Sequence, residues 1–74
     1  MANSGSFPKG HKVKWNWAGN DAFGKVVERF ERDVERTLKG TKVKKHGSKE
    51  NPAYLIKQDD GDEVLKLGSE LKEA

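Results

Sequence analysis

The chain has 74 residues, of which 36% are charged and 32% are hydrophobic, and its formal net charge at pH 7 is +3. A chain of this length forms a single domain that buries roughly 60% of its unfolded surface and has little room for a deep catalytic cleft. Size alone therefore argues against an enzyme. Because the sequence contains no cysteine, the core must be built from aromatic and aliphatic side chains.

Residues 1 to 8 are mostly small and polar, and we expect them to be disordered, with a single domain over residues 9 to 72. The first residues lack the basic start and the apolar stretch of a signal peptide. No apolar run approaches the length of a membrane span. These observations predict a cytoplasmic protein without a membrane segment.

The first predicted strand covers residues 12 to 17, where polar and apolar side chains alternate. Val13, Trp15 and Trp17 share one face of it, which is the period of a half-buried strand. Residues 19 to 21, Gly-Asn-Asp, accept positive φ, so the sequence predicts a hairpin here. Both tryptophans lie on one short element, where they fill a small core or form the wall of a binding site.

Residues 24 to 39 fit two different structures. Their apolar side chains recur at the spacing of a helix face: Val26, Phe30, Val34 and Leu38. The same four positions are even-numbered, so a long hairpin would also place them on one side. Periodicity alone does not separate an amphipathic helix from two strands.

The runs 53 to 57 and 63 to 67 are rich in β-prone residues, and the Asp-Gly pair between them marks a tight reversal. Pro52 cannot donate a ladder hydrogen bond and suits the start of the first run. The two runs therefore predict a second hairpin. Residues 69 to 72 are expected to form a short helical turn.

Charge is unevenly distributed, since basic residues exceed acidic ones in residues 1 to 49 and the reverse holds in residues 50 to 74. A basic half attracts nucleic acid or an acidic protein. Four lysines alternate with apolar residues and so project away from the core as a candidate basic face: Lys12, Lys14, Lys42 and Lys44. A solvated surface with internal charge complementarity accounts for the same pattern, because acids and bases are interleaved between Glu28 and Arg36.

The aromatic side chains are the candidate ligand contacts, because aromatics form cages for methylated ammonium groups or platforms for stacked bases. A domain this small also needs aromatics as core, and we assign Trp15 and Phe30 to that role. Trp17, Phe23 and Tyr54 lie closer to predicted turns and are the candidate ligand-binding aromatics.

No pattern indicates a catalytic site, a cofactor or a metal site. His11 and His46 are lone histidines without a second ligand at suitable spacing. The acidic run 59 to 63 lacks the spacing of a calcium-binding loop and fits a solvated hairpin tip. We therefore expect a protein that is not an enzyme and needs no cofactor.

Four segments, residues 12 to 17, 24 to 26, 36 to 40 and above all 51 to 66, together resemble the hypervirulence-associated Tudor-domain family of small bacterial and fungal proteins. The resemblance covers about residues 7 to 71, and the block Pro-Ala-Tyr-Leu-Ile is its most specific part. It implies an all-β, five-stranded SH3/Tudor-like barrel and favours strands over a helix in residues 24 to 45. The family supplies no reaction and no binding residues to carry over.

These expectations describe a small monomeric binding module with two competing partners. One hypothesis is a protein or peptide received among the aromatics. The other is nucleic acid, with lysines on phosphates and an aromatic stacked on a base. Salt separates them, because phosphate binding weakens steeply as salt rises.

Overall fold

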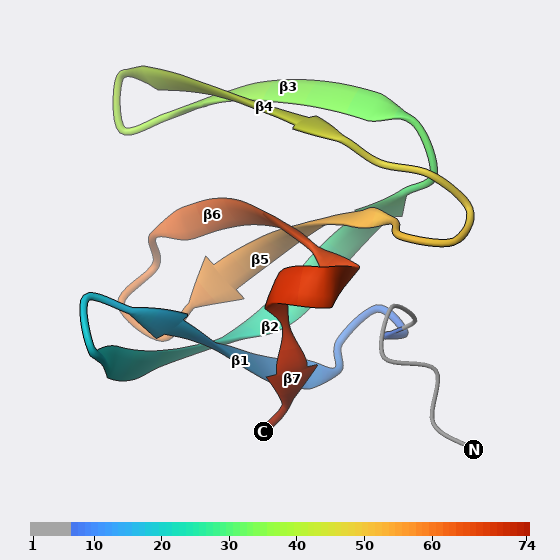
Figure 1. Cartoon of the computed structure of the whole chain (residues 1–74). Helices are drawn as coiled ribbons and strands as arrows, with labels where there is room; N and C mark the ends of the chain where they lie inside the picture. Colours follow the sequence, from blue (N-terminus) through green and yellow to red (C-terminus); the bar gives the residue numbers. More distant parts are fainter. Residues whose placement is uncertain (1–6) are drawn as a thin grey trace.

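The structure is a computed structural model and describes residues 7 to 74. This part of the chain folds into seven strands and one short 3-10 helix (Figure 1): β1 Lys12–Trp17, β2 Asn20–Phe30, β3 Asp33–Leu38, β4 Thr41–His46, β5 Ala53–Gln58, β6 Glu63–Leu67, η1 Gly68–Glu70 and β7 Lys72–Glu73. Every strand pairing is antiparallel. The predicted all-β class is therefore confirmed, as are the hairpins β1–β2 and β5–β6 and the helical turn near the C-terminus. Within the described residues no helix is long and apolar enough to cross a membrane.

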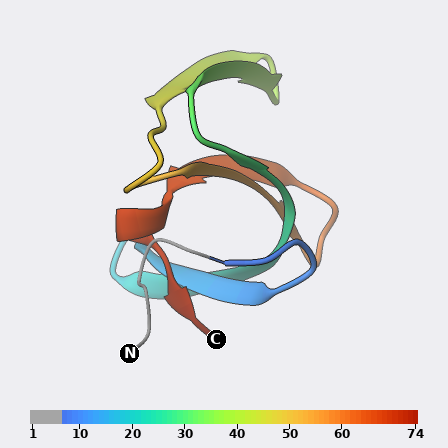
Figure 2. The same cartoon turned by 90° about the vertical axis from the view of Figure 1, so that its right-hand side faces the viewer.

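The strands form two sheets rather than a closed barrel. One sheet has five strands in the order β6-β5-β2-β1-β7 and curves into an open ring, while β3 and β4 form a separate two-stranded ribbon above it (Figure 2). The predicted five-stranded barrel is thus wrong in strand number and in closure. The ladder between β2 and β5 ends at Phe30 and Ala53, because the preceding Pro52 has no N–H to donate. The chain then bends and continues as the ribbon.

Residues 24 to 39 form strands, as the family resemblance implies, and the helical alternative is wrong. They do not keep their apolar side chains on one side, however. A β-bulge lies between Val26 and Glu28, and one extra residue reverses the alternation of the side chains that follow. Val26 therefore packs into one core cluster and Phe30 into the other.

Strand β5 lies between these two clusters and is buried on both faces. Tyr54 and Ile56 belong to a cluster inside the ring, together with Phe7, Val13, Trp15, Val26 and Leu71. Ala53 and Leu55 belong to a cluster beneath the ribbon, together with Phe30, Val34 and Leu65. A continuous apolar run without alternation is typical of a strand covered on both sides. The two-stranded ribbon thus covers a second hydrophobic core.

Phe7 extends the packed domain toward the N-terminus. It is 5% exposed, and its backbone N–H donates to the hydroxyl of Tyr54 at 2.9 Å. Its ring meets that of Tyr54 edge-on with centroids 5.7 Å apart. The expected disordered segment, residues 1 to 8, therefore includes a packed residue, Phe7. Residues 1 to 6 of that segment lie outside the described residues.

Gly24 allows β2 to approach β5 closely where the ring bends. A Cβ atom at this position would lie 2.6 Å from Cγ2 of Ile56 and 2.8 Å from the backbone oxygen of Lys57. Both contacts are far inside van der Waals range, and the second is to backbone that cannot rotate away. The glycine is needed here for space rather than for a positive φ.

We expect Trp15→Ala to unfold the domain or nearly so, because truncation of a buried aromatic costs about 3–5 kcal/mol and a core this small supplies little more. Trp15 is 3% exposed, whereas Trp17 on the same strand is 66% exposed. Trp17→Ala is the matched control and should change the free energy of unfolding much less. Urea denaturation of both variants measures the difference, and equal losses would contradict the assignment of Trp15 to the core.

Candidate functional site

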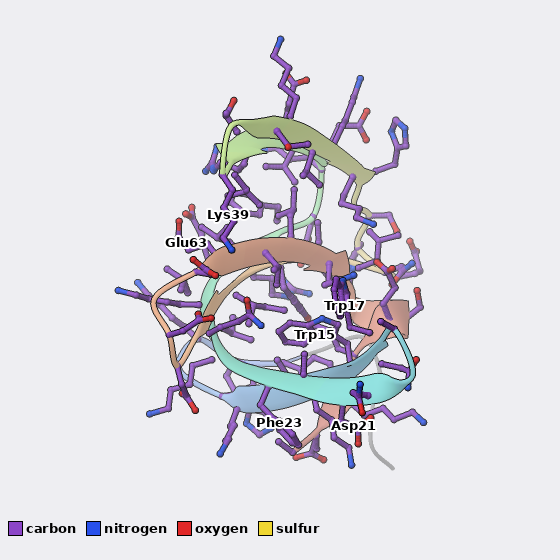
Figure 3. All side chains as sticks on the ribbon, turned by 90° about the vertical axis from the view of Figure 1, so that its left-hand side faces the viewer. Trp15, Trp17, Asp21, Phe23, Lys39 and Glu63 are labelled. Atoms are coloured by element: carbon purple, nitrogen blue, oxygen red, sulfur yellow. The ribbon has the colours of Figure 1, made fainter. Side chains whose placement is uncertain are left out.

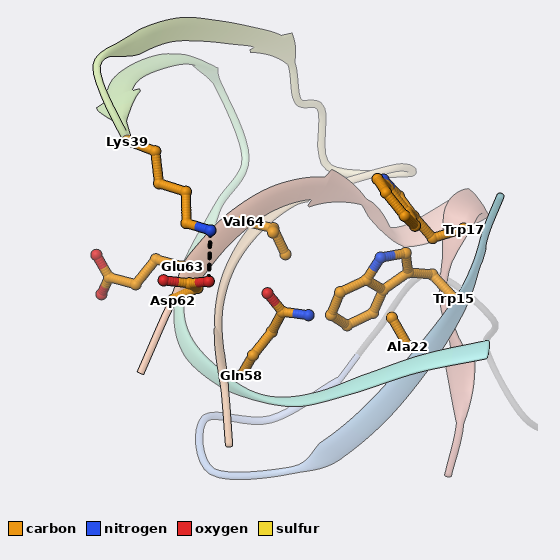
Figure 4. A pocket seen from close by; sticks show the side chains of 8 residues that line it. All are labelled: Trp15, Trp17, Ala22, Lys39, Gln58, Asp62, Glu63 and Val64. Atoms are coloured by element: carbon orange, nitrogen blue, oxygen red, sulfur yellow. Dashed lines mark ion pairs between the residues drawn. The ribbon is translucent and has the colours of Figure 1, made fainter. Parts of the chain in front are cut away.

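A cleft opens between the tip of the β1–β2 hairpin, the edge strand β6 and the ribbon. Two adjoining hollows of about 300 and 340 Å³ share five lining residues, and we call this region the tryptophan cleft: Trp15, Trp17, Lys39, Glu63 and Val64. Figure 4 shows Val64 on β6 facing the ring of Trp15, with Trp17 beside it at the rim. Indole and aliphatic surface dominate the inner wall of the cleft, and charged groups stand at its mouth.

The alternation of β1 turns both indoles toward the same side (Figure 3). Trp15 stands opposite Ala22 and fills the core of the ring, whereas Trp17 is the last residue of the strand and lies beyond that core. A two-residue turn follows, with φ of 52° at Ala18 and 83° at Gly19. This turn is one residue earlier than the Gly-Asn-Asp reversal that the sequence indicated. It holds Trp17 at the rim.

Lys39 closes one end of the cleft. It lies in the two-residue turn between β3 and β4, and its Nζ is 2.6 Å from Oδ2 of Asp62 in the turn before β6. The hydrogen bond with Asp62 raises the pKa of Lys39 above its ordinary value. The side-chain amide of Gln58 lies deeper, pointing toward the Trp15 ring (Figure 4), and offers a donor and an acceptor inside an apolar wall.

Glu70 fixes the other end of the ribbon to η1. Its Oε1 accepts the backbone N–H of Leu67 at 2.8 Å and lies 3.3 Å from Nζ of Lys45 on β4. Burial opposes ionisation of this carboxyl, but the hydrogen bond from Leu67 and the ammonium of Lys45 outweigh it, so the pKa of Glu70 is lowered. Ion pairs therefore connect the ribbon to the five-stranded sheet at both ends of β6.

The three candidate aromatics do not come together. Trp17 alone lines the cleft. Phe23 is 42% exposed but lies on the outer face of β2, opposite Lys14 and 5.7 Å from Nζ of Lys12. Tyr54 is fully buried, and its hydroxyl is occupied by the N–H of Phe7, so it is a core residue and not a ligand contact.

The candidate basic face is also divided in space. Lys12 and Lys14 lie on β1, on one side of the β5–β6 layer, and Lys42 and Lys44 lie on the ribbon at the opposite side (Figure 1). Lys44 stands directly across from Glu35 on β3. The single face of four lysines predicted from alternation is therefore wrong, because alternation places a side chain on a strand face and says nothing about how distant strands pack.

Lys39, Gln58 and Val64 are cleft residues that the sequence did not single out. Lys39 could be recognised only as a turn neighbour of Gly40, and Gln58 only as the end of a strand. Their assembly depends on contacts between hairpins that no local pattern records. Within residues 7 to 74, no group of His, Asp or Glu side chains is arranged to hold a metal ion.

Comparison with known proteins gives one match. The family described as "Hypervirulence associated proteins TUDOR domain" matches residues 10–71, in agreement with the resemblance seen in the sequence. Neither the curated proteins nor the solved structures include a match to the chain.

The depressed pKa of Glu70 predicts acid sensitivity of the link between ribbon and η1. A carboxyl whose pKa is lower in the folded state stabilises the fold above its unfolded pKa, and this contribution is lost as pH falls through the folded value. We expect Glu70→Gln to lower stability at neutral pH and to flatten the decline of stability below about pH 4.5. Urea midpoints measured across this pH range test it, with Glu50→Gln at an exposed position as control. An unchanged acid profile in the Glu70 variant would contradict the assignment.

Proposed function

The chain belongs to the family of hypervirulence associated proteins with a Tudor domain, and on that premise we propose that it is a non-enzymatic binding module that receives a protein or peptide partner in the tryptophan cleft. A Tudor-like domain is a small scaffold whose function lies in the surface it presents. The cleft brings apolar area and polar groups together in a defined concave shape.

The observation that carries the proposal is the exposure of Trp17. Two thirds of this side chain is open to solvent, directly beside a concave wall formed by Trp15 and Val64. Tryptophan buries 150–250 Å² when covered, and it is enriched among residues that dominate binding energy at interfaces. A partner that covers the indole gains this area without any rearrangement of the core.

The ionic pattern of the cleft favours a peptide over nucleic acid at this site. Affinity for nucleic acid grows with the number of phosphates that cations neutralise. Two of the cleft lysines already have carboxylate partners, since Lys39 pairs with Asp62 and Lys45 pairs with Glu70. Acidic side chains of the protein therefore stand where phosphates would have to lie.

Nucleic acid remains a second candidate for a different surface, the outer face of the β1–β2 hairpin. Phe23 is exposed there beneath the ammonium of Lys12, and the pairing of β1 with β2 places Lys14 and Lys25 beside them. An exposed aromatic ring surrounded by cations is the arrangement on which a base stacks while lysines contact phosphates.

We expect Trp17→Ala to weaken peptide binding by at least about thirtyfold, because truncation of a central interface tryptophan typically costs 2 kcal/mol or more. Peptides selected on the wild-type protein from a random display library serve as ligands, and calorimetry gives the dissociation constants. Phe23→Ala removes an exposed aromatic from the opposite face and is the matched control. Equal affinity of the wild type and the Trp17 variant for every selected peptide would refute the cleft as the binding site.

Titration with a generic single-stranded oligonucleotide tests the second candidate. If the hairpin face binds it, the logarithm of affinity should fall linearly with that of salt, by roughly 0.7 for each phosphate neutralised. Lys12→Gln with Lys14→Gln should flatten the slope, whereas Lys42→Gln with Lys44→Gln removes the same charge from the ribbon and should leave it nearly unchanged. Binding weaker than about 1 mM at about 50 mM salt, with a free energy near −4 kcal/mol, would eliminate this candidate.

A cytoplasmic location and a monomeric state are further parts of the proposal. Both follow from the sequence expectations rather than from the cleft. Sedimentation equilibrium of the full chain at micromolar concentration distinguishes a monomer from a dimer.

A further inference from the structure

Strand β6 presents one hydrogen-bonding edge that no described strand occupies. It ends the order of the five-stranded sheet and pairs only with β5. Backbone hydrogen bonds from Gln58 N–H to Asp62 oxygen, 2.7 Å, and from Gly68 N–H to Pro52 oxygen, 2.8 Å, bracket this ladder. These two bonds fix which residues of β6 face β5 and which face away.

In an antiparallel pair, hydrogen-bonded residues alternate with residues whose N–H and C=O point outward. Counting from the two bracketing bonds, Val64 and Lys66 bond to β5, while Glu63, Leu65 and Leu67 present their backbone groups to the open edge. The N–H of Leu67 agrees with this count, because it donates sideways to Oε1 of Glu70. Glu63 and Leu65 are therefore the two rungs of this edge with which no described strand pairs; Glu63 is exposed, whereas Leu65 is 3% exposed and is reached only through the hollow that it lines.

The tryptophan cleft runs along these two rungs. The larger hollow is lined by consecutive residues of β6 from Glu63 to Lys66, by Leu38 and Val43 of the ribbon, and by both indoles. Leu65 lies on the floor of this hollow, so a partner has to enter the hollow to reach that rung. An extended backbone laid there would meet unpaired hydrogen-bonding groups on one side and apolar side chains above and below.

We propose that the partner binds by strand addition: an extended peptide pairs with the open edge of β6 and carries apolar side chains alternating with acidic ones. This inference rests on the proposed function of the cleft and names the mode and chemistry of its partner. Backbone pairing supplies affinity in this mode, and the alternating side chains supply selectivity.

The walls of the cleft determine the alternation. Side chains of the added strand that lie beside Glu63 and Leu65 turn toward the ribbon, where Leu38 and Val43 offer apolar contact. Those beside Lys66 turn the other way, toward Trp17. Lys45 holds Glu70 in an ion pair, whereas Lys66 acts on Glu70 only at longer range, so the ammonium of Lys66 is the cation available to an acidic side chain.

The two ends of the sheet differ in a way that supports this assignment. The opposite edge is β7, which has only two residues and so offers little to a further strand. Strand β6 has five residues, pairs with β5 without a bulge, and contains no proline. Sheet proteins commonly blunt their edges by short strands, bulges or proline. Only the cleft-facing edge of this sheet lacks all three.

The test uses the full chain and a short capped peptide of alternating valine and glutamate, with a valine–lysine peptide as the charge control. We expect the glutamate peptide to bind more tightly and to slow hydrogen exchange of the Glu63 and Leu65 amides. Two further peptides carry methyl groups on alternate backbone nitrogens, one on the odd and one on the even positions. One of them should lose binding and the other should keep it, because only alternate amides of the peptide face β6.

Glu63→Pro removes one outward N–H while leaving the ladder to β5 intact, since proline is tolerated where the N–H faces away from the sheet. It should weaken the peptide about two- to tenfold more than Glu63→Gln, which removes the same charge and keeps the N–H. Circular dichroism of both variants verifies that the fold is retained. Should the proline variant fail to fold, the two methylated peptides test the same rung.

Each outcome bears on a separate claim. Strand addition is overturned if both methylated peptides bind equally well, or if the peptide binds without slowing hydrogen exchange of the Glu63 and Leu65 amides. The proposed binding function of the cleft is unaffected by either result. Failure of the glutamate peptide to bind better than the lysine peptide overturns the stated chemistry. Protection of the same amides that rises with protein concentration assigns the edge to a second copy and overturns the proposal. Loss of the proposed function itself is detected independently, by the insensitivity of library-selected peptides to Trp17→Ala.

Discussion

Burial of β5 on both faces is the constraint on which the rest of the structure depends. Tyr54 and Ile56 are inaccessible inside the ring, and Ala53 is inaccessible on the side of the ribbon. A strand that is apolar on both sides needs two covering layers, and neither the hairpin β1–β2 nor the ribbon alone supplies both. The ring and the ribbon are therefore joined through β5. Loss of either one would expose an apolar face of this strand.

The cleft is a consequence of how this second layer is attached. The ribbon packs over β6 through apolar side chains such as Val43 and Leu65, but it does not hydrogen-bond to β6. Ion pairs tie it to the turns at the two ends of β6, at Asp62 and at Glu70, and Arg36 on β3 lies 3.9 Å from Glu28 on β2. Between Asp62 and Glu70, side chains rather than backbone hydrogen bonds connect the edge of β6 to the ribbon. A fold that closed its barrel would have covered this edge and removed the cleft.

Local signals in the sequence predict the hairpins well and the assembly poorly. The alternation of residues 12 to 17 and the Asp60-Gly61 turn each depend on neighbours in the chain, and both gave the correct element. The bulge after Val26 has no comparable local signature. It reverses the side on which Phe30 lies, and so the even-numbered pattern that suggested one face is divided between two cores.

The same distinction explains the errors at the candidate site. Tyr54 and Phe23 were assigned from their distance to predicted turns, but burial is decided by what packs against a strand from elsewhere in the chain. Phe7, 47 positions away from Tyr54, covers it, whereas Phe23 on the outer face of β2 stays 42% exposed. Trp17 is 66% exposed and lines the cleft, since the last residue of this hairpin strand extends beyond the core; its contact with a ligand stays a prediction.

Trp15 and Trp17 also show how stability and recognition are separated within one strand. They share a face and differ by two positions, yet one lies within the core of the ring and the other beyond it. Burial in the core explains the indole at position 15 but not the one at position 17, where the neighbouring Asn16 is polar and also exposed. Because the two rings line one cleft, a partner that covers Trp17 rests against the core itself. In the proposed binding mode, contact with the packed indole of Trp15 would limit the conformational entropy that binding must overcome.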